Sequence, residues 1–517
     1  MKFVPYILSA LAMILSALML YEGHNWGGDF SQYIAQAIAL ADDNLASWHE
    51  NQAYIVDNSP LKIPLAPYIA PWGTSLLLSL IYKIFGFNLI AFKMLFVLCY
   101  GAFVFVFYRF CERFLESRFC IIATLLFALN PLFLKFCNNI ISDILFLLFS
   151  FLAMIFLARL FEGTNLAKNS DCVSLRFTQL RFALFGGIFA LFAYLVRTNG
   201  LVIITALFCM QIFLLILPRI RRFANFSPPQ IPIFAHILPY MIFISGTICA
   251  NLTLGFGSSG HWGVLSHITI KSIAINVGYY FCVFSDFFAL SNPFYALYSD
   301  IRYAYAFPNP LNFALFVLSI PLIYRGVRIA FAKNPLATIF ILLFMLGFMA
   351  LLILFPARQG IRYTFGVIPF LVFFGILGLS RAKNIARFAT IALIIFFSIK
   401  DISLIVQNIA NDFKSPNTAG EAFSDEARDI YRFIANHTPK DAKIIFFKPR
   451  VLYLNTNRLS FHATTLEHFK KADFVLDSRW EWIETAMIHN LIDELKAQDA
   501  LNAVYENKFF VLYKIND

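Results

Sequence analysis

Apolar segments of about 20 residues recur along the sequence, and each is long enough to cross a hydrocarbon core of roughly 30 Å as a helix. Of the 517 residues, 60% are hydrophobic, 14% are charged and 62 are Phe. A soluble protein of this length would carry about 25% charged residues. The sequence therefore predicts an α-helical polytopic membrane protein. The net charge of +11 does not require nucleic acid, because Lys and Arg first serve to orient membrane proteins.

Basic residues sort the breaks between the apolar segments into two sets. Five breaks are short and rich in Lys and Arg, and the positive-inside rule places them in the cytoplasm. The other breaks alternate with them along the chain, so we expect them to face the opposite side of the membrane. The basic set comprises residues 109–118, 159–181, 219–222, 325–333 and 381–387.

The two sets of breaks fall on opposite sides of the membrane only if residues 73–85 do not cross it. About 13 residues are too few to span it, so we expect a re-entrant helix or one lying on the surface. About eleven spans then remain, which places the N-terminus in the cytoplasm and the C-terminal tail outside. The expected spans are residues 3–21, 92–109, 119–137, 143–160, 181–197, 200–217, 231–254, 311–327, 335–355, 363–380 and 386–404.

The tail differs in pattern from the rest of the chain. Residues 425–434 carry apolar side chains at helical spacing, and residues 443–447 and 473–476 read as buried strands. Residues 504–513 predict a hairpin that turns at Glu506 and Asn507. We therefore divide the chain into two domains. They are a membrane domain at 1–409, with outer loops at 22–91 and 255–310, and a small α/β domain at 410–517.

Ionisable residues gather in the breaks assigned to the outer face. Asp29 follows the first span, and Asp143 opens the fourth. Arg358 and Arg362 lie on this face although the positive-inside rule would place them on the other. Charged groups at membrane depth are costly, so we interpret them as a functional site. Gln32, Tyr33, Lys62, Arg197 and Tyr363 belong to the same breaks.

Each of these residues also has a structural interpretation. Asp29 precedes an amphipathic stripe, so it could be the N-cap of a helix lying on the membrane. Asp143 could cap the fourth span in the same way. Arg362 and Tyr363 could anchor the chain at the membrane interface, and Arg358 could do the same.

The candidate residues fall within motifs whose order is known from one family. The motifs are Gly28-Asp-Phe-Ser-Gln-Tyr33, Pro71-Trp-Gly-Thr-Ser-Leu-Leu-Leu78, Lys83-Ile-Phe-Gly86, Asn130-Pro131, Ser142-Asp143, Leu195-Val-Arg-Thr-Asn-Gly200 and Arg362-Tyr363 before Pro369. In this order the chain resembles the GT-C superfamily of polytopic, lipid-dependent glycosyltransferases over about residues 1–380. It is most similar to the dolichyl-phosphate-mannose protein mannosyltransferase-like group, with the aminoarabinose transferases as relatives.

This resemblance implies transfer of a sugar, with inversion, from a polyprenyl phosphate to an acceptor on the non-cytoplasmic side. By position, Asp29 matches the family's catalytic Asp and Asp143 a second acid of the active site. Arg362 falls where the family keeps a cation near the lipid phosphate. The chemistry is consistent, because the acceptor needs a base and the departing phosphate needs positive charge. We expect Tyr33, Gln32, Lys62, Arg358 and Tyr363 to contact substrate or lipid phosphate as well.

The chain also departs from the family pattern. Ser31 and Gln32 replace the acidic and Arg positions of the aminoarabinose transferases, which argues against that donor and leaves the sugar open. Ala70 stands where many members carry Lys or Arg, and Lys62 is our candidate for the missing cation.

We expect an enzyme of the inner membrane with its active site on the periplasmic face. Its partners would be a polyprenyl-phosphate sugar donor, a glycan, lipid or protein acceptor, and membrane lipids, with no nucleic acid. We expect no cofactor: some relatives bind zinc, but no CxxC or other ligand pair indicates a metal here. The alternative function is a transporter or flippase for a lipid-linked or anionic substrate, because re-entrant segments and intramembrane charges also suit that class.

Overall fold

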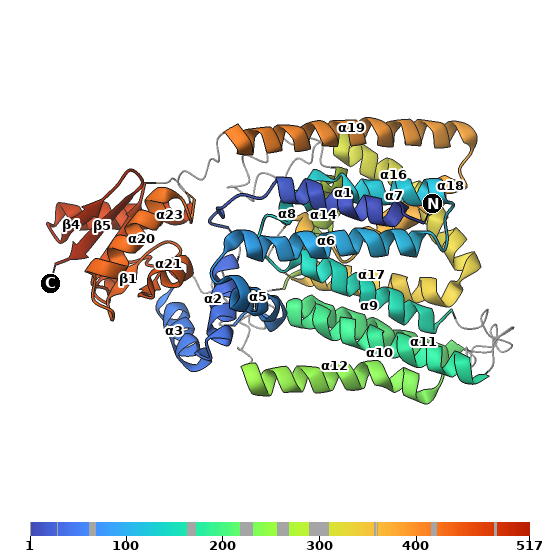
Figure 1. Ribbon diagram of the computed structural model, residues 1–517, viewed down its shortest axis with the longest axis horizontal. Coiled ribbons are helices and arrows are strands. Elements are labelled where there is room, and N and C mark those ends of the chain that lie inside the picture. The colour runs from blue at the N-terminus through green and yellow to red at the C-terminus, as the bar shows by residue number, and fades with distance from the viewer. Residues whose placement is uncertain are drawn as a thin grey trace.

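Long helices run side by side through most of the molecule, and a small sheet domain lies at one end (Figure 1). The computed structural model describes residues 2–27, 29–60, 69–162, 172–217, 231–255, 268–288, 310–355, 358, 360–414, 421–479 and 483–516. Within these residues, 8 helices are long and apolar enough to cross a membrane. They are α6 (Leu89–Cys111), α9 (Asp143–Leu160), α10 (Cys172–Val196), the 3-10 helix η1 (Thr198–Gly200) continued by α11 (Leu201–Ile216), α12 (Ile233–Leu254), α16 (Pro310–Lys333), α17 (Pro335–Leu354) and α19 (Asn384–Lys414). The expectation of a multi-pass helical protein is confirmed.

The other expected spans contain shorter helices. The first is α1 (Val4–Leu18), and the tenth is α18 (Ile368–Ser380). The third is not one helix, because it is divided into α7 (Ser117–Ala128) and α8 (Pro131–Phe136). The division has a local cause: Pro131 cannot donate a backbone hydrogen bond, and the side chain of Asn130 caps the new helix at Leu132 N. A total of eleven spans stays a prediction.

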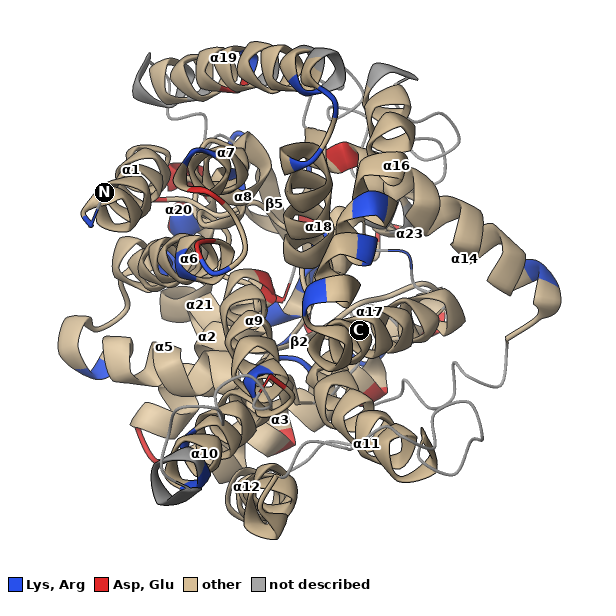
Figure 2. Cartoon of the chain, turned by 90° about the vertical axis from the view of Figure 1, so that its right-hand side faces the viewer, with Lys and Arg blue, Asp and Glu red and all other residues tan. Residues whose placement is uncertain are grey.

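The segment expected to be a re-entrant or surface-lying helix forms the 14-residue helix α5 (Trp72–Phe85). Figure 2 shows α6, α7 and α12 nearly end-on, whereas α5 runs across the view. Its start is fixed against α2 (Phe30–Ala41) by Gln36. The Gln36 side chain donates to Ala70 O and accepts from Ala70 N, each at 3.0 Å. Ala70 therefore serves as a buried backbone contact between these two helices.

The C-terminal tail forms a mixed sheet in the strand order β2-β1-β3-β5-β4. β1 pairs in parallel with β2 and β3, and β5 pairs antiparallel with β3 and β4. The expected helix, both buried strands and the hairpin turn are confirmed. The elements are α20 (Asp425–His437), β1 (Lys443–Ile445), α21 (Pro449–Thr456), β2 (Leu459–Phe461), α22 (Leu466–Phe469), β3 (Phe474–Ser478), α23 (Ile483–Ala497), β4 (Leu501–Glu506) and β5 (Phe510–Ile515).

The tail domain packs on the end of the bundle where α2, α3 (Leu45–Asn58) and α5 lie, away from the N-terminus (Figure 1). The buried Trp26 ring lies 4.9 Å from Phe447 and 5.8 Å from Phe446, centroid to centroid. Asn51 Nδ2 also donates to the Tyr453 hydroxyl at 2.8 Å. The division of the chain at residue 409 stays a prediction, since α19 continues to Lys414.

Candidate active site

A buried lysine fixes the loop that leads to Asp29. Lys93 Nζ, near the start of α6, donates to Tyr21 O at 2.8 Å, to Gly23 O at 2.6 Å and to Asn138 Oδ1 at 2.7 Å. The Lys93 side chain is fully buried, so these three oxygens replace the water that its ammonium group would otherwise bind. The loop is thus tied to α6 and to the segment between α8 and α9.

His24 adds a second attachment to the same loop. Its Nδ1 bonds to Asn25 O at 2.8 Å, and its Nε2 accepts from Ile140 N at 3.2 Å. The ring stacks on Phe30, in the first turn of α2, with centroids 3.9 Å apart. Burial lowers the pKa of His24 to about 3, so the imidazole is neutral and keeps one donor and one acceptor nitrogen. The loop therefore meets α2 in a fixed orientation.

Asp29 occupies the N-cap position of α2, as the structural interpretation expects, but its carboxylate makes no capping hydrogen bond. The backbone of Asp29 does begin the helix, because its carbonyl oxygen accepts from Tyr33 N at 3.1 Å. The side chain is exposed, although the residues that follow it in α2 are buried. The carboxylate is held at the helix start and its oxygens are not used by the helix.

Tyr33 connects Asp29 to Asp143, the second acid predicted from the sequence. Its side chain is buried, shares a hydrogen bond with Ser142, and lies within electrostatic reach of Asp29, Asp143 and Arg197. Burial raises the pKa of Tyr33 and the Asp29 carboxylate raises it further, so the phenol stays protonated. Residues from the first loop and from the start of α9 thus meet at one phenol ring.

Asp143 is the first residue of α9 and forms an ion pair with Arg197, which follows the end of α10. Exposed fractions of the two side chains are 2% and 13%. Arg362 Nη1 lies 3.9 Å from the other carboxylate oxygen of Asp143. One buried carboxylate therefore meets two guanidinium groups, which leaves a surplus of positive charge.

Tyr363 packs against both of these arginines. The Arg197 guanidinium lies 4.2 Å and that of Arg362 5.5 Å from the centre of the Tyr363 ring. These are cation–π distances, which keep charged side chains in place without neutralising them. Arg362 and Tyr363 lie in the short 3-10 helix η6 (Ile361–Thr364), between α17 and α18.

Arg358 joins this cluster from the side of α14 (Ile270–Val283), a helix inside the large loop that the sequence did not predict. Its Nε donates to Asn276 Oδ1 at 2.9 Å, and its guanidinium lies 5.7 Å from the Tyr279 ring centre. Tyr279 also accepts from Gly360 N at 2.8 Å. Helix α14 therefore holds both Arg358 and Gly360, which stands two positions before Arg362.

Tyr280 on α14 is a further member of the cluster. It is within electrostatic reach of Arg197, Arg358 and Tyr363. Only 1% of Tyr280 is exposed, and its hydroxyl has no hydrogen-bond partner among the described residues. A buried hydroxyl without a partner costs free energy, so this one is a candidate ligand for a substrate oxygen.

The structure thus brings together five of the residues singled out in the sequence: Asp29, Tyr33, Asp143, Arg362 and Tyr363. Arg358 borders them, whereas Gln32 accepts a hydrogen bond from Arg450 of the tail domain. Lys62 lies outside the described residues. The catalytic and binding roles of all these residues stay predictions.

Sequence reasoning missed Lys93, Tyr280 and Arg450. A lysine inside an apolar run was a usable indication for Lys93, because buried charges in spans need partners. No local pattern marks the other two, since Tyr280 lies in an aromatic stretch and Arg450 meets Gln32 from 418 positions along the chain.

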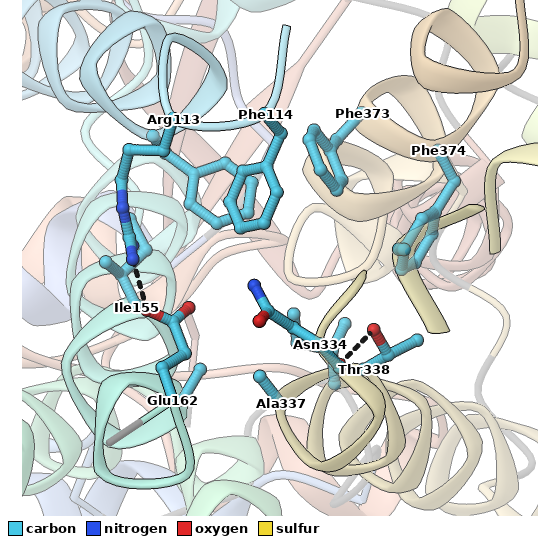
Figure 3. Close-up of a pocket in the computed structure, with 13 residues that line it drawn as sticks. Arg113, Phe114, Ile155, Glu162, Asn334, Ala337, Thr338, Phe373 and Phe374 are labelled. Carbon is cyan, nitrogen blue, oxygen red and sulfur yellow. Dashed lines mark hydrogen bonds and ion pairs between the residues drawn. The ribbon is translucent and has the colours of Figure 1, made fainter. Parts of the chain in front are cut away.

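A recess at the opposite end of the bundle is separate from this cluster. It is lined by residues that include Arg113, Glu162, Asn334 and Phe373 (Figure 3). Arg113 and Glu162 form an ion pair just beyond the C-terminal ends of α6 and α9, whereas Asp143 is at the N-terminal end of α9. Across the described residues, no three His, Cys, Asp or Glu side chains group in a way that could hold a metal ion.

Solved structures of two proteins share this architecture at low sequence identity. ArnT from Cupriavidus metallidurans, an aminoarabinose transferase crystallised with undecaprenyl phosphate, is 10% identical, with a TM-score of 0.59 over 98% of this chain and 97% of that chain. The apo Archaeoglobus fulgidus oligosaccharyltransferase is 13% identical, with a TM-score of 0.54 over 92% of this chain and 70% of that chain. Both are GT-C glycosyltransferases, so the expected GT-C fold is confirmed. The sequence itself matches no protein-family profile and no curated protein.

The buried imidazole of His24 predicts a pH-dependent stability. Its pKa falls from the ordinary 6.5 to about 3, so below pH 6.5 the denatured state binds a proton that the folded state does not. The contribution of the neutral imidazole to the free energy of unfolding is complete above pH 6.5. It falls by about 1.4 kcal/mol per pH unit from there towards pH 3. Thermal denaturation in detergent at about pH 7.5 and about pH 5 should show a smaller difference in His24→Gln than in the wild type. An equal difference in both proteins would refute the buried neutral imidazole.

Asp143→Asn should destabilise the protein by about 3–5 kcal/mol, because it leaves the Arg197 guanidinium buried without its carboxylate. The double variant Asp143→Leu, Arg197→Met removes both charges and should recover much of this loss. Thermal denaturation of the purified variants measures both effects. Denaturation of the single variant at the wild-type temperature would show that the ion pair does not hold the site together.

Proposed function

We propose that this protein is an inverting glycosyltransferase that moves a sugar from a polyprenyl-phosphate carrier to an acceptor at the periplasmic face of the inner membrane. One observation carries the proposal. Asp29 presents an exposed carboxylate that its own helix does not use, next to a cluster in which Arg197 and Arg362 meet the buried Asp143 and Arg358 lies at the border. A base beside an anion site is what displacement of a lipid phosphate by a hydroxyl requires.

In the proposed reaction the acceptor hydroxyl gives its proton to Asp29 as its oxygen attacks the anomeric carbon of the sugar. The bond from that carbon to the phosphate oxygen breaks, and its electron pair leaves with the polyprenyl phosphate. Attack opposite the departing group inverts the configuration. A carboxylate suits the base role if it is well placed and accessible, and the Lys93 and His24 contacts fix the loop that leads to Asp29.

The arginine cluster would bind the phosphate and stabilise its charge as the bond breaks. Arg197, Arg358 and Arg362 are held by Asp143, Asn276 and Tyr363, so their positions are set before substrate binds. Guanidinium groups remain charged at any physiological pH and match phosphate oxygens in geometry. The Tyr280 hydroxyl would donate a further hydrogen bond to the phosphate.

The structurally similar proteins support both the lipid-linked donor and the separate acceptor of this reaction. ArnT binds undecaprenyl phosphate, and the archaeal oligosaccharyltransferase, tethered with an acceptor peptide, has a TM-score of 0.52 with this chain at 12% identity. We therefore assign a polyprenyl-linked donor and a separate acceptor to this chain. The orientation follows from the basic breaks, which put the Arg109–Glu112 turn in the cytoplasm and the tail domain in the periplasm.

Asp29→Asn should abolish transfer and leave the fold intact, because Asn can occupy an N-cap but cannot take the proton. Transfer is measured as the initial rate in membranes of a deletion strain that carries the full-length variant. The donor is radiolabelled polyprenyl-phosphate sugar extracted from the parent strain. Purified Asp29→Asn should denature at the wild-type temperature and should bind undecaprenyl phosphate with unchanged affinity. A wild-type rate in this variant would refute the assignment of Asp29 as the base.

A further inference from the structure

Arg450 of the tail domain reaches the start of α2 and is buried there. It lies in the first turn of α21, and 6% of it is exposed. Its Nη1 donates to Gln32 Oε1 at 2.8 Å, and its Nε donates to Gln52 Oε1 at 3.1 Å. Gln32 belongs to α2 and Gln52 to α3, and each is 1% exposed. One guanidinium from the tail thus joins two helices of the first loop.

The charge of Asp29 acts on this guanidinium. Burial lowers the pKa of Arg450 to about 10, and the Asp29 carboxylate acts in the opposite direction. The group therefore remains charged near neutral pH. Gln32 follows Asp29 by three positions, which places both side chains on the same face of the first turn. The two charges therefore attract each other across the junction between the membrane and tail domains.

Resting on the proposed function, we infer that Arg450 is a positioning residue, which holds the Asp29 carboxylate in its working position and links that position to docking of the tail domain. The helix does not hold the carboxylate by a capping bond, so its orientation depends on its surroundings. A cation held in place by Gln32 restrains the carboxylate by attraction and leaves its exposed oxygens available to an acceptor.

Docking alone does not require an arginine at this position. The junction already has the Trp26 contact with Phe447, the Asn51–Tyr453 hydrogen bond and a bond from His462 N to Ser59 Oγ at 3.1 Å. An apolar side chain at this position alone would take a donor from the buried amide oxygens of Gln32 and Gln52, but apolar side chains at all three positions would pack there without the cost of removing a guanidinium from water. The buried charge is explained if it serves the neighbouring carboxylate.

Arg450→Met tests this inference, because it keeps the length of the side chain and removes the charge and the donors. We expect the initial rate of transfer to fall about 10- to 100-fold, the size of effect that misplacement of a reacting group causes. The rate is measured in membranes of the deletion strain with the extracted lipid-linked sugar. The affinity of the purified full-length variant for undecaprenyl phosphate should stay within about twofold of the wild type, because the arginines of the phosphate cluster are held by Asp143, Asn276 and Tyr363.

Tyr453→Phe is the matched control. It removes the hydrogen bond to Asn51 at the same junction and on the same helix, yet does not touch Gln32 or Asp29. We expect this variant to transfer at the wild-type rate. A similar fall in rate for both variants would show that Arg450 only docks the tail domain, and a wild-type rate in Arg450→Met would overturn the inference outright.

Two further variants separate this inference from the proposed function. Arg450→Lys restores the charge without the paired donors and should recover part of the lost rate. Asp29→Asn removes base-assisted transfer and leaves only the trace that the phosphate cluster supports by itself. In this background Arg450→Met should lower that trace no further, because the carboxylate that it positions is gone. An additional fall there would contradict a role through Asp29. Full activity of Asp29→Asn alone would instead refute the proposed function.

Discussion

The buried ion pair between Asp143 and Arg197 is the interaction on which the rest of the site depends. Apolar helices surround both groups, so neither charge could be buried there without the other. The pair brings the start of α9 to the end of α10, and it attracts Arg362 from the break before α18. Tyr33 then joins this group to the helix that begins at Asp29. Four distant parts of the chain are thus arranged around one carboxylate.

Buried polar groups that need hydrogen-bond partners also order the first loop. The fully buried Lys93 draws two backbone carbonyls and one side chain around its ammonium group. His24 is neutral and uses both ring nitrogens. Polar groups that would be costly in an apolar bundle therefore fix the backbone that carries Asp29. The carboxylate itself remains exposed, which is the combination that a general base requires.

The sequence predicted the helical bundle, the tail domain and the meeting of Asp29, Asp143 and Arg362 on one face of the bundle. The alternation of basic breaks made this possible, since it put Asp29, Asp143 and Arg362 on one face. Helix lengths were less predictable, because capping by Asn130 before Pro131 divides an apolar run that hydropathy alone treats as continuous. The capping hydrogen bond considered for Asp29 is absent, although its position at the helix start was right.

Contacts between distant segments of the chain could not be predicted from the sequence. Periodicity describes one element at a time, so it carries no information on which residue of the tail would meet α2. Arg450 and Tyr280 consequently became visible only in three dimensions, where one lies beside Gln32 and the other beside the arginines. The roles proposed for both rest on burial and charge, which the folded chain creates.

A cryo-electron microscopy structure of the full chain with undecaprenyl phosphate bound tests the central claim most directly. The account predicts that the phosphate contacts Arg197, Arg358 or Arg362, and that the Asp29 carboxylate faces the space beside it. Binding of the phosphate elsewhere, such as the recess beside Arg113 at the other end of the bundle, with no ligand at the arginine cluster, would contradict it.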